Sequence, residues 1–329
     1  MLDVRKLRML SALDRLGTIV AVADELHLTA PGISMQLSAL EREVGLVLTE
    51  RHGRRLALTP AGRVLADHGH EILDRLALAE MEVDAIRGGR VGRYRVAAFP
   101  TAASTLVCDA WEVLRSEQAG LELVLTTPEP EQALALLVAG DTDLAVVHGY
   151  SNVPRGLPDG VAAEPIAVEP VWLAIRSDDP LAGDDVDLAD LADHPWITPD
   201  RTLSCFQMAD RACGLAGFRP AIVAETMDFA VQLELVRAGI GVALVPHLAV
   251  AQLPAEVMLA RPKQGLERYI FATRRTAMNA EPGLRTLIKA LRRAADDRLR
   301  VSNIRSVYPE RPMTSCPRRR VQMPRSAPA

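Results

Sequence analysis

The sequence has few cysteines, few aromatic residues and no long hydrophobic run. Its four cysteines in 329 residues are too few and too scattered for a disulfide framework or a zinc site: Cys108, Cys205, Cys213 and Cys316. Aromatic residues make up 4% of the chain, so Ala, Val and Leu dominate the expected cores. The first residues lack the apolar run of a signal peptide, and no later segment could span a bilayer. We therefore expect a cytoplasmic protein that does not enter a membrane.

The motifs of an enzyme are also missing. No Ser-His-Asp spacing, phosphate-binding Gly loop, metal-ligand cluster or pair of carboxylates stands out from chance. We expect no catalytic activity, no cofactor and no metal.

Charge is present but unevenly distributed around a net value of −4. Residues 1–65 carry nine Lys and Arg against seven Asp and Glu, whereas residues 298–329 carry eight Arg against one Glu. The stretch between them is acidic. A basic end joined to an acidic body is typical of a chain in which one module binds a polyanion. Residues 297–329 are rich in Arg and Pro without apolar periodicity, which predicts a disordered basic tail.

Residues 17–45 have the pattern of a helix-turn-helix. A short helix is expected over residues 18–26, and Thr29 is a good N-cap for a second helix because its hydroxyl can accept a bond from a first-turn N–H. Pro31 falls in the first turn, where its missing N–H costs nothing. The second helix has apolar positions spaced four, three and four residues apart, which we expect to be buried: Ile33, Leu37, Leu40 and Val44.

The opposite face of that helix carries small or uncharged polar side chains that fit a major groove. Gln36 can read adenine through its amide, and Ser34 can contact a base or a phosphate. A basic stretch follows and is expected to contact the DNA backbone or minor groove, the alternative being a solvated charge cluster. The candidate DNA-binding residues are Thr29, Ala30, Pro31, Gly32, Ser34, Met35, Gln36, Ser38, Arg51, Arg54 and Arg55.

A heptad-like apolar pattern runs through residues 59–88. It consists of Leu65, Ile72, Leu76, Ala79, Val83 and Ile86, and it ends at Gly88 and Gly89. This spacing predicts a long helix that pairs with a second copy of itself, with Gly69 as its weak point. The alternative is one amphipathic helix packed on its own domain.

From Arg93 onward, short β-like runs alternate with helix-like segments. Residues 93–99, 121–127, 143–149, 171–177, 221–225 and 241–246 have the first pattern, and residues 102–115 and 131–139 the second. Such alternation predicts α/β units with parallel sheet. There are too many strands for one small sheet, so we expect two α/β lobes.

The segment LEREVGLVLTERHGRRLALTPAGRVL, residues 40–65, resembles the end of the winged helix of LysR-type transcriptional regulators. The matching residues are Leu40, Glu41, Val44, Gly45, Leu48, Arg51, Leu58, Thr59, Ala61 and Gly62, with Ala23, Leu26, Pro31, Ser34 and Gln36 upstream. Two positions depart from the family pattern. Thr49 stands where the family usually has phenylalanine, and Met35 where it usually has arginine. Loss of that arginine predicts altered operator preference or affinity.

The resemblance continues more loosely to about residue 296. PTAAS after the strand at 93–99, GDTDLAV at residues 140–146, residues 165–180 and GIGVALVP at residues 239–246 resemble family segments. The implied fold is α+β overall, with a winged helix-turn-helix at 1–58, a linker helix at 59–88 and an effector-binding domain at 92–296. That domain resembles the periplasmic-binding-protein type, with lobe I at 92–164 and 267–296 and lobe II at 165–266.

The function implied by the resemblance is sequence-specific regulation of transcription. Dimers, and tetramers built from two dimers, would bind a dyad-symmetric operator in double-stranded DNA and contact RNA polymerase. A small-molecule effector between the lobes would change the arrangement of the dimers. The alternative is a two-lobed binding protein without a genetic role, which residues 1–62 disfavour.

Ligands of open α/β sheets bind beyond the carboxyl ends of the strands, where helix N-termini favour anions. The candidate effector-binding residues are Pro100, Thr101, Ser104 and His148 in lobe I, and Thr198, Thr202, Ser204, Thr226 and Met227 in lobe II. Their hydroxyls favour a small carboxylate or a similar polar ligand. Individually, each is also an ordinary N-cap candidate, and a lone His at a strand end is commonly structural.

Paired cysteines raise a further alternative, a regulator that senses peroxide through a thiol. Cys205 and Cys213 fall near the positions used by some relatives, but Ser204 stands at the first of them. Eight residues of helix separate two groups by about 12 Å, too far for a disulfide without local unwinding. Buried, unreactive cysteines are the commoner case.

Overall fold

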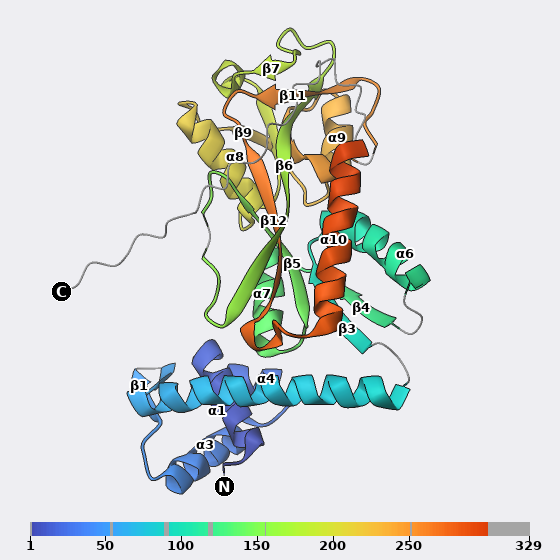
Figure 1. Cartoon of the computed structure of the whole chain (residues 1–329). Helices are drawn as coiled ribbons and strands as arrows, with labels where there is room; N and C mark the ends of the chain where they lie inside the picture. Colours follow the sequence, from blue (N-terminus) through green and yellow to red (C-terminus); the bar gives the residue numbers. More distant parts are fainter. Residues whose placement is uncertain are drawn as a thin grey trace, which may run out of the picture.

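The computed structural model describes residues 2–52, 55–88, 92–117, 121–154, 156–250 and 252–301. A small helical domain holds the N-terminus, one long helix crosses between it and the rest, and a two-lobed α/β body holds the remainder (Figure 1). This architecture confirms the predicted fold class. Residues 302–329 of the predicted tail lie outside the described residues.

The N-terminal domain consists of three helices and a two-stranded hairpin. The helices are α1 (Val4–Leu16), α2 (Ile19–Glu25) and α3 (Ala30–Val44), and the hairpin pairs β1 (Thr49–His52) with β2 (Arg55–Leu58) in antiparallel register. The core is apolar and includes Leu10, Leu13, Val22, Ile33, Leu40 and Leu48. Gly17 and Gly45 end α1 and α3 in left-handed backbone conformations, which glycine adopts without steric penalty.

The predicted caps and buried face of α3 are confirmed. The Thr29 hydroxyl accepts a hydrogen bond from the Gly32 N–H at 3.3 Å, with Pro31 in the first turn. Ile33, Leu37 and Leu40 are buried, and Val44 packs partly buried against the same core.

Thr49 is held by a carboxylate of α3. Glu41 Oε1 accepts hydrogen bonds from the backbone N–H of Leu48 at 2.9 Å, the backbone N–H of Thr49 at 3.0 Å and the Thr49 hydroxyl at 3.0 Å. The Thr49 hydroxyl, which phenylalanine lacks, therefore adds a hydrogen bond between the start of the hairpin and α3.

The long helix α4 (Pro60–Gly88) begins one residue after the predicted start and ends at Gly88. Its glycines allow close packing. A Cβ at Gly62 would lie 2.1 Å from the Leu48 carbonyl oxygen, and one at Gly69 would lie 2.8 Å from the Ser11 hydroxyl of α1. Gly69, predicted as the weak point of the helix, thus lies where α4 packs against Ser11 and Leu7 of α1 with no room for a Cβ.

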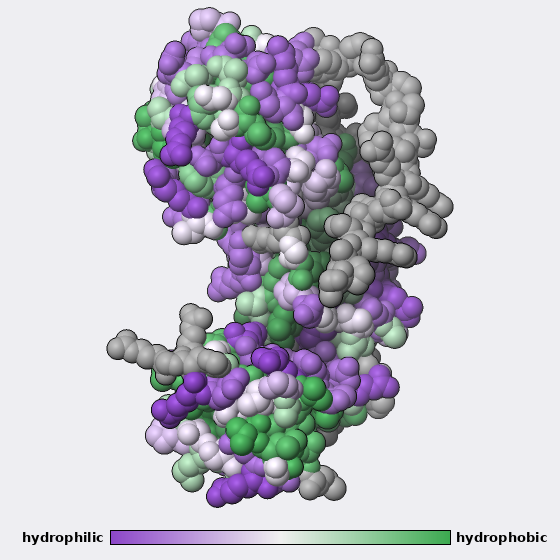
Figure 2. All heavy atoms as spheres, turned by 90° about the vertical axis from the view of Figure 1, so that its left-hand side faces the viewer, coloured by the Kyte–Doolittle hydropathy of each residue, from purple (hydrophilic) through white to green (hydrophobic). Residues whose placement is uncertain are grey.

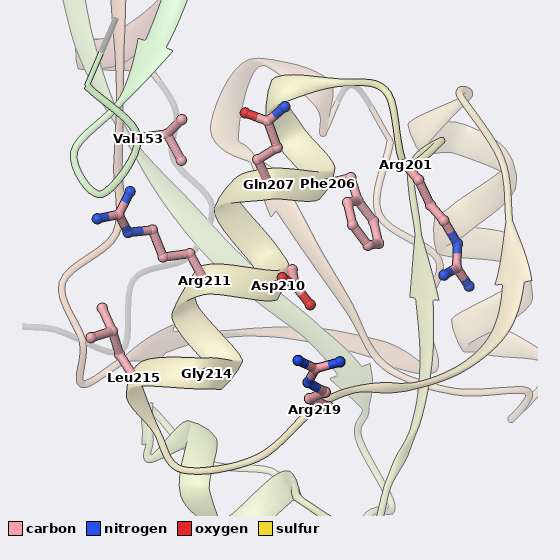
Figure 3. A pocket seen from close by; sticks show the side chains of 9 residues that line it. All are labelled: Val153, Arg201, Phe206, Gln207, Asp210, Arg211, Gly214, Leu215 and Arg219. Carbon is pink, nitrogen blue, oxygen red and sulfur yellow. The ribbon is translucent and has the colours of Figure 1, made fainter.

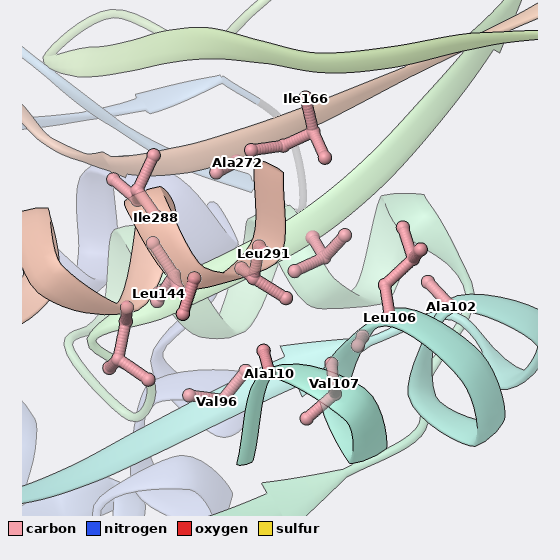
Figure 4. Packing of buried hydrophobic residues seen from close by; sticks show 14 of the residues in the cluster. Val96, Ala102, Leu106, Val107, Ala110, Leu144, Ile166, Ala272, Ile288 and Leu291 are labelled. Atoms are coloured by element: carbon pink, nitrogen blue, oxygen red, sulfur yellow. The ribbon is translucent and has the colours of Figure 1, made fainter. Parts of the chain in front are cut away.

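Lobe I is a sheet covered by helices on both faces. The strands β3 (Gly92–Ala98), β4 (Leu121–Thr126) and β5 (Leu144–Tyr150) pair in parallel, and β12 (Glu267–Arg275) joins β5 antiparallel. A short α5 (Pro100–Ala102), a π-helical turn (Ala103–Val107) and α6 (Cys108–Glu117) pack with α10 (Pro282–Val301) on one face (Figure 4). Helix α7 (Pro130–Ala139) covers the other face.

Lobe II has the same three-layer design. Its central strands are the second half of β6 (Val161–Arg176), β10 (Ala243–Pro246) and β11 (Val257–Pro262), with β7 (Asp185–Val186) at the edge. The strands β8 (Pro195–Thr198) and β9 (Ala221–Glu225) form a parallel pair. Helix α8 (Ser204–Leu215) covers one apolar cluster and α9 (Phe229–Arg237) the other. Short 3₁₀ turns lie at Leu188–Leu191, His247–Ala249 and Thr276–Met278.

Two antiparallel strands, β6 and β12, join the lobes. Residues 161–170 of β6 pair with β12, and from Val171 the strand pairs with β10 and then β11 of lobe II. The predicted lobe boundary at residues 164 and 165 therefore falls inside a continuous strand, and the change of partner comes at Pro170 and Val171. A residue-by-residue boundary is not visible in sequence because a strand that crosses between lobes keeps its β-like pattern throughout.

The predicted start of the disordered tail is corrected. Residues 297–301 form the end of α10, and the Arg298 guanidinium pairs with Asp109 of α6, with an Nη2–Oδ1 distance of 2.8 Å. This ion pair binds the end of α10 to lobe I, which an excess of arginine in the sequence does not reveal.

Candidate nucleic-acid interface and effector cleft

The exposed face of α3 carries the predicted DNA-reading residues. Pro31, Ser34, Gln36 and Ser38 are exposed, and Met35 is 72% exposed. Thr29 is exposed at the N-cap, while Ala30 and Gly32 are half-buried in the first turn. Figure 2 shows further apolar residues gathered on one side of this domain. From Thr29 to Ser38 the face of α3 is therefore uncovered, without charged side chains and in part apolar, and the exposed Arg42 and Glu43 follow toward its end.

The wing contributes part of the predicted basic cluster. Arg51 is exposed on β1, opposite Leu56 in the hairpin register. Arg55 begins β2. Arg54 lies outside the described residues.

The predicted lobe I residues gather where β3 and β5 end. Pro100 and Thr101 begin α5 directly after β3, and Ser104 is exposed on the π-helical turn with its hydroxyl bonded to the Thr101 carbonyl at 3.3 Å. His148 is buried in β5 and meets the Phe99 ring edge-on, with ring centroids 4.6 Å apart. A π-helical turn is an uncommon structure that is frequent at functional sites.

The predicted lobe II residues are less uniform. Thr198 ends β8 buried, and its carbonyl accepts from the Thr226 N–H at 3.0 Å. Ser204 is buried as the first residue of α8. By contrast, the exposed Thr202 hydroxyl donates to Asp200 at 2.6 Å, and Met227 is 53% exposed. Thr202 therefore stabilises its own turn. Thr198 and Ser204 are the buried members of the set, and Thr226 is joined to Thr198 through the backbone.

A buried ion pair, missed by sequence reasoning, joins the two strands that connect the lobes. Arg268 of β12 and Glu169 of β6 are both fully buried, with 2.6 Å between Nε and Oε1. The second oxygen of Glu169 accepts from the Leu248 N–H of lobe II at 2.6 Å, and Arg268 Nη2 donates to the Thr101 hydroxyl of lobe I at 3.0 Å. The pair thus connects groups from both lobes.

Two aromatic residues, Phe99 and Tyr150, lie close to this pair. The Arg268 guanidinium lies 4.9 Å from the centroid of Phe99, a cation–π distance. Burial disfavours the charged form of Arg268, but the adjoining Glu169 raises its pKa, so the ionic pair persists. Burial also raises the pKa of the nearby Tyr150 hydroxyl, and Arg268 opposes that shift. Tyr150 is therefore a neutral phenol at physiological pH.

The N-terminus of α8 lies beside the pair. Leu203 occupies its N-cap position without a side-chain hydrogen bond, so the helix lacks a side-chain cap there. Ser204 Oγ and Thr198 Oγ1 are buried and have no hydrogen-bond partner among the described residues. A buried hydroxyl without a partner costs about 1–3 kcal/mol, so each favours a bound polar group.

A sequence signal for the missed residues does exist. Glu169 interrupts the apolar run IAVEPVW, and Arg268 interrupts LERYIFA. A charged residue inside a β-like run is either exposed on one face or paired in the interior. Sequence periodicity alone does not choose between these, because the pairing depends on two strands almost a hundred residues apart.

The two cysteines of α8 are packed in the lobe II core. Burial raises the pKa of Cys205 to about 12, with Glu129 adding to the shift and Arg268 opposing it. Burial, and then Asp210, raise the pKa of Cys213 to about 12. Both thiols stay protonated at neutral pH, and the thiolate is the reactive form. The geometry therefore favours a packing role over a peroxide sensor.

The described residues contain neither a membrane-spanning helix nor a cluster of metal ligands. No helix there is both long and apolar enough to cross a membrane. No three His, Cys, Asp or Glu side chains of the described part of the chain lie together as metal ligands would.

Two family models match the chain. The model for the bacterial regulatory helix-turn-helix protein of the lysR family matches residues 4–63, and the model for the LysR substrate binding domain matches residues 87–296. Among curated relatives, the regulator ShiR of Corynebacterium glutamicum (strain R) is 34% identical over 245 residues, which cover 69% of this chain and 80% of that protein. The RuBisCO operon transcriptional regulator of Allochromatium vinosum is 28% identical over 251 residues, covering 74% and 79%.

Solved structures of similar fold extend over nearly the whole described chain. Full-length CbnR complexed with its target DNA has 26% sequence identity and a TM-score of 0.52, covering 89% of this chain and 100% of that one. A hydrogen-peroxide-bound mutant of Corynebacterium glutamicum OxyR has a TM-score of 0.57 at 24% identity, covering 91% and 94%, and supports the fold alone. With both of its domains matched in order, the chain belongs to the LysR family of helix-turn-helix transcriptional regulators, with a DNA-binding and an effector-binding domain.

Proposed function

We propose that the chain binds a dyad-symmetric operator as a dimer or tetramer, and that a small carboxylate held between the lobes controls this binding and the contacts with RNA polymerase. The observation that carries the proposal is the uncovered face of α3, which presents Ser34, Gln36 and Ser38 opposite a fully buried apolar face. A regulator that binds operator DNA acts where that DNA is, so the predicted cytoplasmic location belongs to this proposal.

Reading of the operator falls to α3 and the wing. The N-terminus of the helix offers N–H groups to a phosphate, and Gln36 can form two hydrogen bonds with adenine. Met35 supplies an apolar contact to a thymine methyl group in place of a charged one. Arg51 contacts the backbone electrostatically, which fixes position without reading sequence.

Pairing of two chains falls to α4. Ile72, Leu76 and Val83 keep heptad spacing and are 39%, 41% and 48% exposed in the single chain. Leu65, the first member of the pattern, instead packs against the core of its own domain. The two predictions for the heptad pattern thus apply to different ends of α4. The end at Leu65 packs on its own domain, and the end that exposes Ile72, Leu76 and Val83 needs a second copy to cover it.

The effector site lies at the N-terminus of α8. A ligand carboxylate there would accept from the Ser204 hydroxyl and from first-turn N–H groups, with Thr101 and Arg268 on the lobe I side. Glu129 also interacts electrostatically with Arg268. The pKa of Glu129 is raised, first by burial and second by the neighbouring Glu131. Because the Glu129 carboxylate would lie near the carboxylate of the ligand, the site favours a ligand that also carries a hydroxyl or an amine. That group can donate a hydrogen bond to Glu129.

A route from the cleft to the linker helix runs along β12. Arg268 lies at the cleft end of this strand, and Arg275 at the other end places its Nε 2.6 Å from Asp74 Oδ1 of α4. Movement of β12 on ligand closure therefore reaches α4 directly. A ligand shifts the arrangement only by as much as it binds one state better than the other.

The first test is fluorescence anisotropy on DNA from upstream of the chain's own gene and on random DNA, across a salt series. We expect tight binding to the first and weak, strongly salt-dependent binding to the second. Leu76→Glu should abolish the dyad-site preference by dissociating the dimer. Leu157→Glu, a change at an exposed leucine of similar exposure (45%), is the matched control. Full dyad-site affinity in Leu76→Glu would contradict the pairing role.

The effector site is tested by a thermal-shift screen of small carboxylates and hydroxycarboxylates. For at least one compound that raises the Tm, Ser204→Ala should weaken binding about tenfold, as expected for one lost hydrogen bond to a charged group. Ser116→Ala, at an exposed serine of α6, should leave it unchanged. Equal affinity in both variants would place the ligand elsewhere.

A further inference from the structure

A depression lies on the outer side of lobe II. Helix α8 turns Met208, Ala209 and Ala212 into the core and leaves Asp210 and Arg211 exposed on its other face. Above this exposed face is a depression of about 540 Å³ (Figure 3). Its volume lies within the range of small-molecule sites. It is built from a different face of α8 than the buried Ser204 at the cleft.

Three arginines from three segments surround the depression. Arg201 comes from the loop before α8, Arg211 from α8 itself and Arg219 from the loop after it. In Figure 3 Arg201 and Arg219 lie on the side of α8 that carries Asp210, whereas the Arg211 side chain extends to the opposite side of the helix. Guanidinium groups bind carboxylates and phosphates through paired N–H donors, so this arrangement fits an anion held from several sides.

The charges of the depression are only partly compensated. Arg201 pairs with Glu225 at 2.9 Å and lies 5.8 Å from the Phe206 ring centroid. Within the part of the chain that the structure describes, no ion pair involves Arg211 or Arg219. Asp210 is the one acidic side chain of the lining. The three arginines together with Glu225 and Asp210 therefore carry a net charge of one positive unit.

The remaining lining limits the ligand further. Asp210 lies between the arginines and, as a carboxylate, accepts hydrogen bonds from a hydroxyl or an amine. Gly214 adds no side chain, and a Cβ there would meet nothing within 4 Å. No local contact in the structure requires glycine at this position, and its effect is to keep the floor of the depression low.

We propose that this depression is a second binding site, for a small hydroxylated anion whose carboxylate or phosphate contacts Arg219 while its hydroxyl donates to Asp210, with Arg211 adding positive charge on the other side of α8. The site does not depend on the effector cleft, because none of its lining residues belongs to the Arg268–Glu169 network. Two chemical sources supply such a ligand, a hydroxycarboxylate and a sugar phosphate.

The test is isothermal titration calorimetry of the full chain with citrate and, separately, with glucose 6-phosphate at low ionic strength. We expect saturable binding of at least one probe, and the preferred probe identifies the source. Arg219→Gln should weaken its binding about tenfold, the effect of one lost charge-assisted contact, and Arg211→Gln should weaken it less, through the lost charge alone. Binding should also weaken as salt is added, because the arginines are exposed.

The sharper variant is Asp210→Asn, which removes the charge that opposes the anion and keeps an amide oxygen that accepts from the ligand's hydroxyl, so binding of the same probe should strengthen about threefold. A merely structural role for these side chains gives no such gain. Arg285→Gln, at an exposed arginine of α10, is the matched control and should leave the Kd unchanged. Ser204→Ala at the cleft should also leave it unchanged. Absence of saturable binding of both probes, or one Kd for all variants, would overturn the proposal.

Discussion

The two regulatory surfaces of this chain differ in how their side chains are held. The recognition face of α3 is exposed, and its polar side chains are free to meet DNA. The proposed effector site instead has buried polar groups, with Arg268 bonded to Glu169 and Thr101. If the proposed roles hold, DNA reading needs little rearrangement of the protein, whereas effector binding competes with bonds already made.

Removal of one partner of the buried ion pair should have the largest effect. Glu169→Ala leaves the Arg268 charge buried without its carboxylate, and we expect a loss of about 3–5 kcal/mol in the free energy of unfolding. Urea denaturation of the full chain, followed by tryptophan fluorescence, measures it. The double variant Glu169→Leu with Arg268→Met should recover most of the loss. A loss below about 1 kcal/mol would mean that water reaches the pair.

A single change on α3 should affect DNA reading and little else. Gln36→Ala should cost about 1–3 kcal/mol of operator binding, the value of one bidentate base contact, with random DNA bound as before. Because Gln36 is exposed, the Tm should not change. Gln132→Ala on α7, another exposed helical glutamine, serves as control. Equal weakening on operator and random DNA would assign Gln36 to the phosphate backbone instead.

The contact between lobe I and the linker helix should have a smaller effect on stability and a specific one on control. Burial raises the pKa of Asp74, and Arg275 opposes the shift. Asp74→Asn removes the ion pair but leaves Arg275 bonded to the Leu137 and Thr142 carbonyls at 2.9 and 2.8 Å. We expect a loss of about 1 kcal/mol. Calorimetry with an identified effector should show unchanged effector affinity, while anisotropy shows a reduced effector response on DNA. An undiminished response would exclude this route.

The smallest effect should be a pH dependence from His247. Burial lowers its pKa, opposed by Glu169, and its Nδ1 accepts from Trp172 Nε1–H at 3.1 Å. Because the unfolded state binds the proton more readily, stability should fall as pH drops through the ordinary histidine pKa of about 6.5 toward the lower folded value. Unfolding curves between pH 7.5 and 5 measure the slope. His247→Gln should reduce it, and His68→Gln, at an exposed histidine of α4, should not.

Sequence patterns predicted local features well and long-range ones poorly. The Thr29 cap, the buried face of α3 and the strand at residues 221–225 follow from neighbours within one turn or one strand, and the structure confirms them. The end of the effector-binding domain was placed too early, at residue 296, because the last turn of α10 is held by Asp109, far away in the chain. The proposed roles of the DNA-reading and effector-binding residues stay predictions.

The sequence by itself determined the order of the domains, the family and which face of α3 is exposed, because helix caps and apolar periodicity are local properties of the chain. Tertiary structure alone decided that Glu169 and Arg268 form a buried pair, that Thr202 turns to Asp200 while Ser204 faces inward, and that three arginines around α8 surround one depression. Those groupings depend on which strands become neighbours and which loops meet, and no spacing along the chain encodes such distances.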